Sequence, residues 1–181
     1  MLPYNAKDIA ASFRTVRRNT IAIAQDIPEE KYSFVAAPEV KPVAKMLSHI
    51  ALAARFQTMI HREKRTSFEG IDFGRIMGEF GAEENRPRTK AELIELLTTE
   101  GEAFASFVEG LDDNFLSERV TMRPGMGAQS KTRFEMLLGV KEHEMHHRGQ
   151  LMLIQRMLGI VPHLTRQTQE RMALRQQASQ R

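Results

Sequence analysis

Apolar side chains recur at steps of three and four residues along four segments of this chain, and this spacing restricts its fold more than any other feature. Such steps place side chains on one face of an α-helix. The first segment spans residues 5–26, and Pro28 follows its end. Its stripe consists of Ile9, Phe13, Val16, Thr20, Ile23 and Ile27. No segment alternates apolar and polar residues as a half-buried strand would, so we expect no strands.

The second helix is expected to begin at Pro42, because proline suits the first turn of a helix. Its stripe consists of Met46, His49, Ala53, Phe56 and Ile60. After this helix, residues 64–88 are interrupted by glycine and proline. We therefore predict a long connection there, with room for one short helix.

The third and fourth helices each open on a capping box, in which two residues satisfy each other's free backbone N–H groups. Thr89 and Glu92 form the first box, and Thr132 and Glu135 form the second. The fourth helix is expected to end at Gly159, because glycine is typical of a helix C-terminus. Residues 112–130, between these two helices, form a second long connection.

These segments predict an all-α fold: an up-and-down four-helix bundle with long connections after helices 2 and 3. The length of 181 residues fits one domain, so residues 1–165 are assigned to a single bundle. Residues 166–181 form a basic tail rich in Gln and Arg. The sequence leaves open whether this tail is a helical extension or disordered.

Charge and hydropathy argue against two classes of partner. The net charge is +3, and the tail carries four arginines against one glutamate, so the body of the chain is neutral. We expect no nucleic-acid partner, which would need basic residues clustered on the folded body. We expect no membrane span either, because no apolar run approaches the roughly 20 residues required. The first ten residues show no secretory signal, which favours a cytoplasmic location.

Two histidines on the fourth helix, His143 and His147, lie about 40° apart on the helix face. They continue an apolar stripe, so we expect both imidazoles to face the bundle interior. Burying an imidazole costs free energy unless its nitrogens find a hydrogen-bond partner or a metal ion, and one metal ion shared by both rings would meet this need. His49 lies on the apolar stripe of the second helix and is the natural third ligand.

The other three histidines fit such a site less well. His146 points to the other side of the fourth helix, and His61 lies roughly 120° away from the His49 face of the second helix. His163 follows Pro162 in a turn. The predicted metal ligands are therefore His49, His143 and His147.

Three imidazoles suit a divalent ion such as Zn, Ni or Fe. Three protein ligands also leave positions open for water or substrate, as in catalytic sites. The chain has no Cys, which excludes thiolate zinc sites, iron–sulfur clusters and cysteine nucleophiles. Gln150 points in nearly the same direction as the histidine pair. It is expected either to bond a ligand or to satisfy a buried backbone group.

The stretch from His143 to His147 also matches the H-E-x-x-H motif of zinc proteases, in which the glutamate is the general base. This interpretation would make Glu144 catalytic. The extended form of the motif fails here, because Gln150 stands where glycine is required. Such proteases also use a strand edge to bind an extended peptide, and the sequence predicts no strand. The protease is therefore the weaker interpretation.

Several short stretches together resemble the DinB-like (DinB/YfiT) family of metal-dependent four-helix bundles. The resemblance runs from about residue 5 to residue 164. It rests on Ile27-Pro28-Glu29-Glu30-Lys31, on the segment from Val43 to Ile50, on His143-Glu144-Met145-His146-His147-Arg148-Gly149-Gln150-Leu151, and on Leu158-Gly159-Ile160-Val161-Pro162. The combination of these stretches carries the resemblance.

The resemblance implies a metal held by His49, His143 and His147, a long connection between helices two and three, and a homodimer. Characterised relatives include bacillithiol-type transferases and a mycothiol-dependent isomerase, in which the metal lowers the pKa of a small thiol. Our leading hypothesis is a metal-dependent enzyme acting on a small molecule. It would be a transferase that uses a low-molecular-weight thiol, or a hydrolase. The alternatives are a non-catalytic metal-stabilised binding or stress-response module, and a helical protein whose histidines are hydrogen-bonded core residues.

The two long connections are expected to border the metal pocket. The side chains that we expect to line it are Phe68, Phe73, Phe80, Arg123 and Met126.

Overall fold

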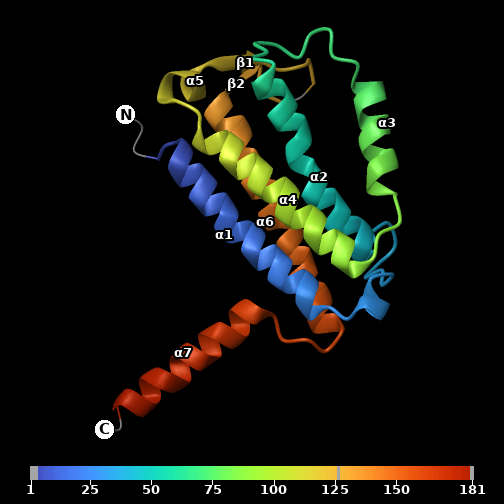
Figure 1. The fold of residues 1–181 in the computed structure, drawn as a ribbon, viewed down its shortest axis with the longest axis vertical. Helices are drawn as coiled ribbons and strands as arrows, with labels where there is room; N and C mark the ends of the chain where they lie inside the picture. The colour runs from blue at the N-terminus through green and yellow to red at the C-terminus, as the bar shows by residue number, and fades with distance from the viewer. Residues whose placement is uncertain (1–3, 126, 180–181) are drawn as a thin grey trace.

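Four long helices lie side by side in the computed structural model, which describes residues 4–125 and 127–179 (Figure 1). They are α1 (Ala6–Asp26), α2 (Val43–Arg62), α4 (Lys90–Glu109) and α6 (Arg133–Met157). Shorter elements connect them: the 3₁₀ turn η1 (Glu29–Lys31), α3 (Phe73–Glu84), α5 (Asp113–Ser117), β1 (Arg119–Thr121) and β2 (Ser130–Thr132). The helix α7 (His163–Ser179) ends the described chain. The predicted all-α bundle is confirmed.

The helix boundaries follow from the capping residues. The Thr89 hydroxyl accepts a hydrogen bond from the backbone N–H of Glu92, and the Glu92 carboxylate accepts one from the backbone of Thr89. Thr132 and Glu135 make the same reciprocal pair at the start of α6. Both capping boxes predicted from the sequence are present. Asn5 caps α1 in the same way, with Asp8 as its partner.

The core forms where the apolar stripes of the four helices meet. Ile9, Phe13 and Ile23 of α1 are fully buried, and α1 packs against α4 and α6. The Phe13 ring meets the Phe104 ring of α4 edge to face at 4.7 Å between centroids. α2 packs on the same two helices from the other side. The spacing of apolar residues therefore fixes which face of each helix turns inward.

The helices do not alternate strictly in direction, because α2 and α4 run parallel. Arg88, just before α4, bonds to Ser48 near the start of α2, and Glu100 further along α4 pairs with Arg55. The long connection after α2 contains α3, which carries the chain back along the bundle (Figure 1). α3 is the one short helix for which the sequence left room in this connection. Its return places it beside α2, outside the four-helix core, and the sequence did not predict that position.

The expectation of no strand is wrong for the second connection. β1 pairs antiparallel with β2, with Arg119 opposite Thr132 and Thr121 opposite Ser130. Each strand has only three residues, which is too few to show the alternation that marks a strand in a sequence. This small sheet lies at the end of the bundle where α6 begins (Figure 1).

The basic tail is helical through Ser179, and α7 projects away from the bundle (Figure 1). At its start the half-exposed Arg166 forms an ion pair with Asp26 of α1, and the buried His163 ring lies 3.2 Å from the Asn19 amide oxygen. Further along, Met172 and Leu174 are exposed. Among the described residues, no helix is both long enough and apolar enough to cross a membrane.

His61 is a core histidine, not a ligand. It is 1% exposed, and its Nδ1 lies 3.1 Å from the guanidinium of the buried Arg133, from which it accepts a hydrogen bond. Burial, and then the Arg133 charge, lower the pKa of His61 to about 4 from its ordinary 6.5. The side chain therefore stays neutral in the folded protein at pH 5.

We expect His61 to make stability fall as the pH drops from 6.5 towards 4. In that window the unfolded chain takes up a proton at residue 61 and the folded protein does not. A pKa unit corresponds to about 1.4 kcal/mol, so the loss attributable to His61 near pH 4.5 is about 2–3 kcal/mol. His61→Gln keeps an acceptor for Arg133 and cannot titrate. Urea unfolding at pH 7 and pH 4.5 should show a smaller loss in this variant, and equal losses would contradict the assignment.

Candidate metal centre

A buried ion pair sets the rotation of α6 in the bundle. Glu144 is 1% exposed and Arg17 of α1 is 4% exposed. Their side chains meet through three hydrogen bonds of 2.9–3.0 Å, and the Thr20 hydroxyl donates another of 2.7 Å to Glu144. The Arg17 guanidinium also donates to the backbone oxygens of Leu97 in α4 and Ile50 in α2. This one arginine therefore links all four long helices.

The packing around Arg17 depends on Gly101 of α4. A Cβ atom at that position would lie 2.8 Å from Cγ of Arg17, which is too close for any other residue type without movement. With Glu144 turned to the centre of the bundle, His143 and His147 lie on the flank of the buried stripe. Both are half-buried there. They do not point into the middle of the core, as the sequence suggested, but towards α2.

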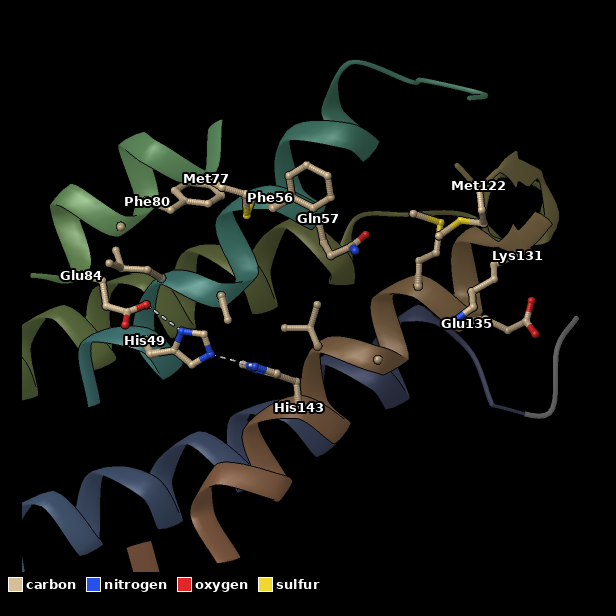
Figure 2. Close-up of a pocket in the computed structure, with 16 residues that line it drawn as sticks. His49, Phe56, Gln57, Met77, Phe80, Glu84, Met122, Lys131, Glu135 and His143 are labelled. Carbon is tan, nitrogen blue, oxygen red and sulfur yellow. Dashed lines mark hydrogen bonds and ion pairs between the residues drawn. The ribbon is translucent and has the colours of Figure 1, made fainter. Parts of the chain in front are cut away.

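Three imidazoles converge on this flank. His49 Nε2 lies 3.0 Å from His143 Nε2, and His147 Nε2 lies 3.1 Å from the same atom. Figure 2 shows His49 on α2 and His143 on α6 pointing towards each other. Within the described part of the chain, these three histidines form a cluster of side chains that could hold a metal ion. Their ligand atoms lie within 4.8 Å of one another, close enough to share an ion.

The neighbours of His49 and His147 determine which ring nitrogen carries the proton. His49 Nδ1 lies 2.8 Å from a carboxylate oxygen of Glu84, and His147 Nδ1 lies 2.8 Å from the amide oxygen of Gln150. Both oxygens only accept hydrogen bonds, so Nδ1 donates in each ring. The Nε2 atoms of His49 and His147 then carry no proton, and their lone pairs are available to a metal ion. Such outer partners typically orient metal-binding histidines.

The environment favours neutral rings in the two α6 histidines. Burial, and then the neighbouring His147 and His49, lower the pKa of His143 to about 4 from its ordinary 6.5. Burial also lowers the pKa of His147, although its bond to Gln150 acts in the opposite sense. Neutral imidazole is the form that binds a metal ion. Both side chains are therefore ready to act as ligands at neutral pH.

The spacing of the three nitrogens is compatible with a tetrahedral metal, since all three lie within 4.8 Å of one another. Ligand nitrogens at the usual zinc distance are about 3.3 Å apart, close to the separations of 3.0 and 3.1 Å found here. Without an ion, two lone pairs face one nitrogen of His143, which can donate to only one of them. The other nitrogen of His143, Nδ1, is buried without a partner among the described residues. Hydrogen bonds alone therefore leave one of the lone pairs that face His143 Nε2 without a partner, and an ion bound between the three rings would accept all three Nε2 lone pairs.

Glu84, the last residue of α3, is the outer partner that sequence reasoning missed. Its carboxylate bonds His49 through one oxygen and Lys41 through the other. Burial opposes its ionisation, but the hydrogen bonds from Lys41 and His49 outweigh burial and hold the pKa of Glu84 below its usual range. The charged form of Glu84 therefore persists beside His49. No periodicity or motif marks residue 84, because it lies within the connection between α2 and α4.

We expect Glu84→Ala to weaken zinc binding by about 10- to 100-fold, the usual cost of removing an outer partner of a metal-binding histidine. Glu84→Gln keeps an acceptor for His49 and should lie between this variant and the wild type. Glu79→Ala is the matched control, because Glu79 lies on the same helix and pairs with the exposed Arg75. Competition with a chromophoric chelator measures the affinities. Equal affinities for Glu84→Ala and Glu79→Ala would contradict this role.

The structure separates the remaining site candidates. The sequence offered Glu144 as a general base, but both of its oxygens are bound to Arg17 and Thr20 in the core, so the H-E-x-x-H interpretation is wrong. Gln150 contacts His147 through its amide oxygen, and its amide nitrogen lies 3.2 Å from the exposed His146. His146 therefore lies outside the group of three.

A cavity of about 510 Å³ opens beside His49 and His143 (Figure 2). Of the loop residues expected to line it, Phe80 does so. Phe68 is instead buried against Phe56 and Phe73, and Arg123 lies over the Phe73 ring at 4.5 Å. Phe68, Phe73 and Arg123 do not line the cavity. Met126 lies outside the described residues.

Comparison with known proteins identifies relatives of this chain. Residues 12–151 match the sequence model of the DinB superfamily. The fold is similar to the crystal structure of a DinB-like protein from Bacillus subtilis, with a TM-score of 0.60 and 20% sequence identity over 83% of this chain and 92% of that chain. At this identity the structural likeness concerns the fold alone. No curated protein matches this chain.

Proposed function

Because this chain belongs to the DinB superfamily, we propose that it is a metal-dependent enzyme acting on a small molecule. The observation that carries the proposal is the convergence of His49, His143 and His147 beside a cavity of about 510 Å³. Three protein ligands leave part of the coordination shell open, which is the pattern of catalytic metal sites. An open cavity beside the ligands favours turnover over a purely stabilising metal.

The roles of the chain's own residues follow from their contacts. His49, His143 and His147 would hold the ion through Nε2, and Glu84 and Gln150 fix the orientation of two of these rings. Zn, Ni and Fe all suit this set of nitrogens. An ion bound there would act as a Lewis acid and lower the pKa of a thiol or water that reached it.

We propose group transfer with a low-molecular-weight thiol as the reaction class. The chain has no Cys, so the sulfur nucleophile has to come from a small molecule. The thiol loses its proton to solvent, its sulfur forms a bond to carbon in the second substrate, and the bond from that carbon to the leaving group breaks. The leaving group departs with the electron pair and is protonated by solvent. Hydrolysis is the same exchange with water in place of the thiol.

The activity is tested with zinc-, nickel- and iron-loaded protein, a panel of small thiols with a chromogenic haloarene, and a chromogenic ester for hydrolysis. We expect turnover that His143→Ala abolishes. His146→Ala is the matched control, because it removes an exposed imidazole from the same helix outside the group of three, and it should keep most of the activity. Metal-loaded protein that accelerates neither reaction class would favour a non-catalytic module.

A further inference from the structure

The cavity beside the histidines is elongated and bounded by three helices. α2 contributes His49, Leu52, Ala53, Phe56 and Gln57, and α6 contributes residues from Glu135 to His143. On each of these two helices the first and last lining residues are eight positions apart, which is about 12 Å along the axis. One face of α3 forms the outer wall, with Met77 and Phe80 directed at α2 (Figure 2).

The walls of this cavity are apolar along most of their length. The side chains between its two ends include Leu52, Phe56, Phe80, Met136 and Val140. Lys131 and Glu135 stand at the end away from the histidines, and both are exposed. The Glu135 carboxylate is occupied by the capping box with Thr132. A strongly polar ligand body would therefore give up its hydrogen bonds to water and find few replacements along the walls between the two ends.

One polar group interrupts the apolar lining. The Gln57 amide oxygen is buried, and no hydrogen-bond partner for it exists among the described residues. Figure 2 shows the Gln57 side chain extending from α2 into the cavity. An unpaired buried acceptor is costly, and a ligand that donates a hydrogen bond removes this cost once a rotation of the amide has brought the oxygen to the cavity surface. Since Gln57 and His49 are eight residues apart on α2, the donor would lie about 12 Å from the reacting end.

We infer that the substrate is an elongated small molecule with an apolar body, aliphatic or aromatic. It carries its reacting group at the His49 and His143 end and a hydrogen-bond donor at the level of Gln57. The inference rests on the proposed function for the reacting end, whereas the cavity and Gln57 define the rest of the molecule. Gln57 is then a specificity-determining residue, because it selects ligands with a donor over equally apolar ligands without one.

Hydroxamates of increasing chain length test the apolar body. Their head group binds a metal ion and their alkyl chain can extend into the cavity. With zinc-loaded protein in a calorimetric titration, we expect binding to tighten by about tenfold for each added pair of methylenes from butane to octane hydroxamate. Zinc content is measured in the same samples. Equal affinities along the series in protein that holds zinc would overturn the inference and leave the proposed function intact.

Gly139→Leu is the variant that fills part of the cavity with a side chain. Gly139 lines the cavity in the middle of α6, and a Cβ atom there would meet nothing within 4 Å, so the variant should fold and hold zinc. We expect the affinity of this variant for the hydroxamates not to increase with the length of their alkyl chain. If wild-type protein held no zinc, nickel or iron, the proposed function would fail. Binding of n-alkanols from butanol to octanol to that protein would then test the apolar body of the ligand. Affinity that rises with chain length would support it, and equal affinities would contradict it.

Gln57 is tested with octane hydroxamate and the same molecule bearing a terminal hydroxyl. We expect Gln57→Leu to shift the preference by about tenfold towards the plain chain, because the hydroxyl loses its acceptor. Gln176→Leu, the same exchange at an exposed position of α7, should leave the preference unchanged. An unchanged preference in Gln57→Leu would overturn the assignment of Gln57.

Discussion

Replacing Glu144 by alanine is expected to lower the free energy of unfolding by about 3–5 kcal/mol, the usual cost of removing one partner from a buried ion pair. Arg17 is 4% exposed in the wild type, so the variant leaves a buried charge uncompensated among four helices. Urea denaturation monitored by circular dichroism measures the loss.

Glu142→Ala is the matched control for this prediction, because Glu142 is an exposed glutamate two positions away. It should change stability by less than about 0.5 kcal/mol. The double variant Arg17→Met and Glu144→Met should be more stable than Glu144→Ala alone, since well-packed apolar side chains can replace a buried ion pair at little cost. A loss as small for Glu144→Ala as for Glu142→Ala would show that the pair does not anchor α6.

Zinc is expected to raise the melting temperature of the wild-type protein by roughly 10 °C. A ligand at 1,000 times its dissociation constant stabilises the folded state by about 4 kcal/mol. Each kcal/mol raises the melting temperature of a chain of this size by about 2–4 °C. The shift should disappear in His143→Ala, because His143 Nε2 lies within 3.1 Å of the other two ligand atoms.

His146→Ala should show the same zinc-dependent shift as the wild type in scanning calorimetry. It removes one imidazole from the same helix without touching the three converging nitrogens. A zinc effect that persists in His143→Ala, or that vanishes in His146→Ala, would place the binding site elsewhere on α6.

Local sequence signals are sufficient to predict the four long helices of the bundle and the face that each one buries. The Thr89 and Thr132 capping boxes depend on residues three positions apart, so they can be read directly from the chain. The buried stripe of α1 is equally local. The parallel course of α2 and α4 could not be predicted, because it depends on how far the connection through α3 carries the chain. No pattern within residues 64–88 encodes that distance.

The candidate site was predictable where it lies on periodic helices. His49, His143 and His147 each lie on or beside an apolar stripe, and the structure brings their nitrogens together. Glu84 was not predictable, since its contact with His49 requires the fold of α3 against α2. Glu144 was misleading because the H-E-x-x-H motif names residue types and not directions. Its direction is set by Arg17, which is 127 residues away in the chain.

Metal content by mass spectrometry tests the central claim most directly. Untagged wild-type protein is measured after reconstitution, beside His49→Ala, His143→Ala and the control His146→Ala. The three-histidine centre predicts about one divalent ion per chain in the wild type and the control, and its loss in the other two variants. No metal in reconstituted wild-type protein, or full occupancy in His143→Ala, would contradict it.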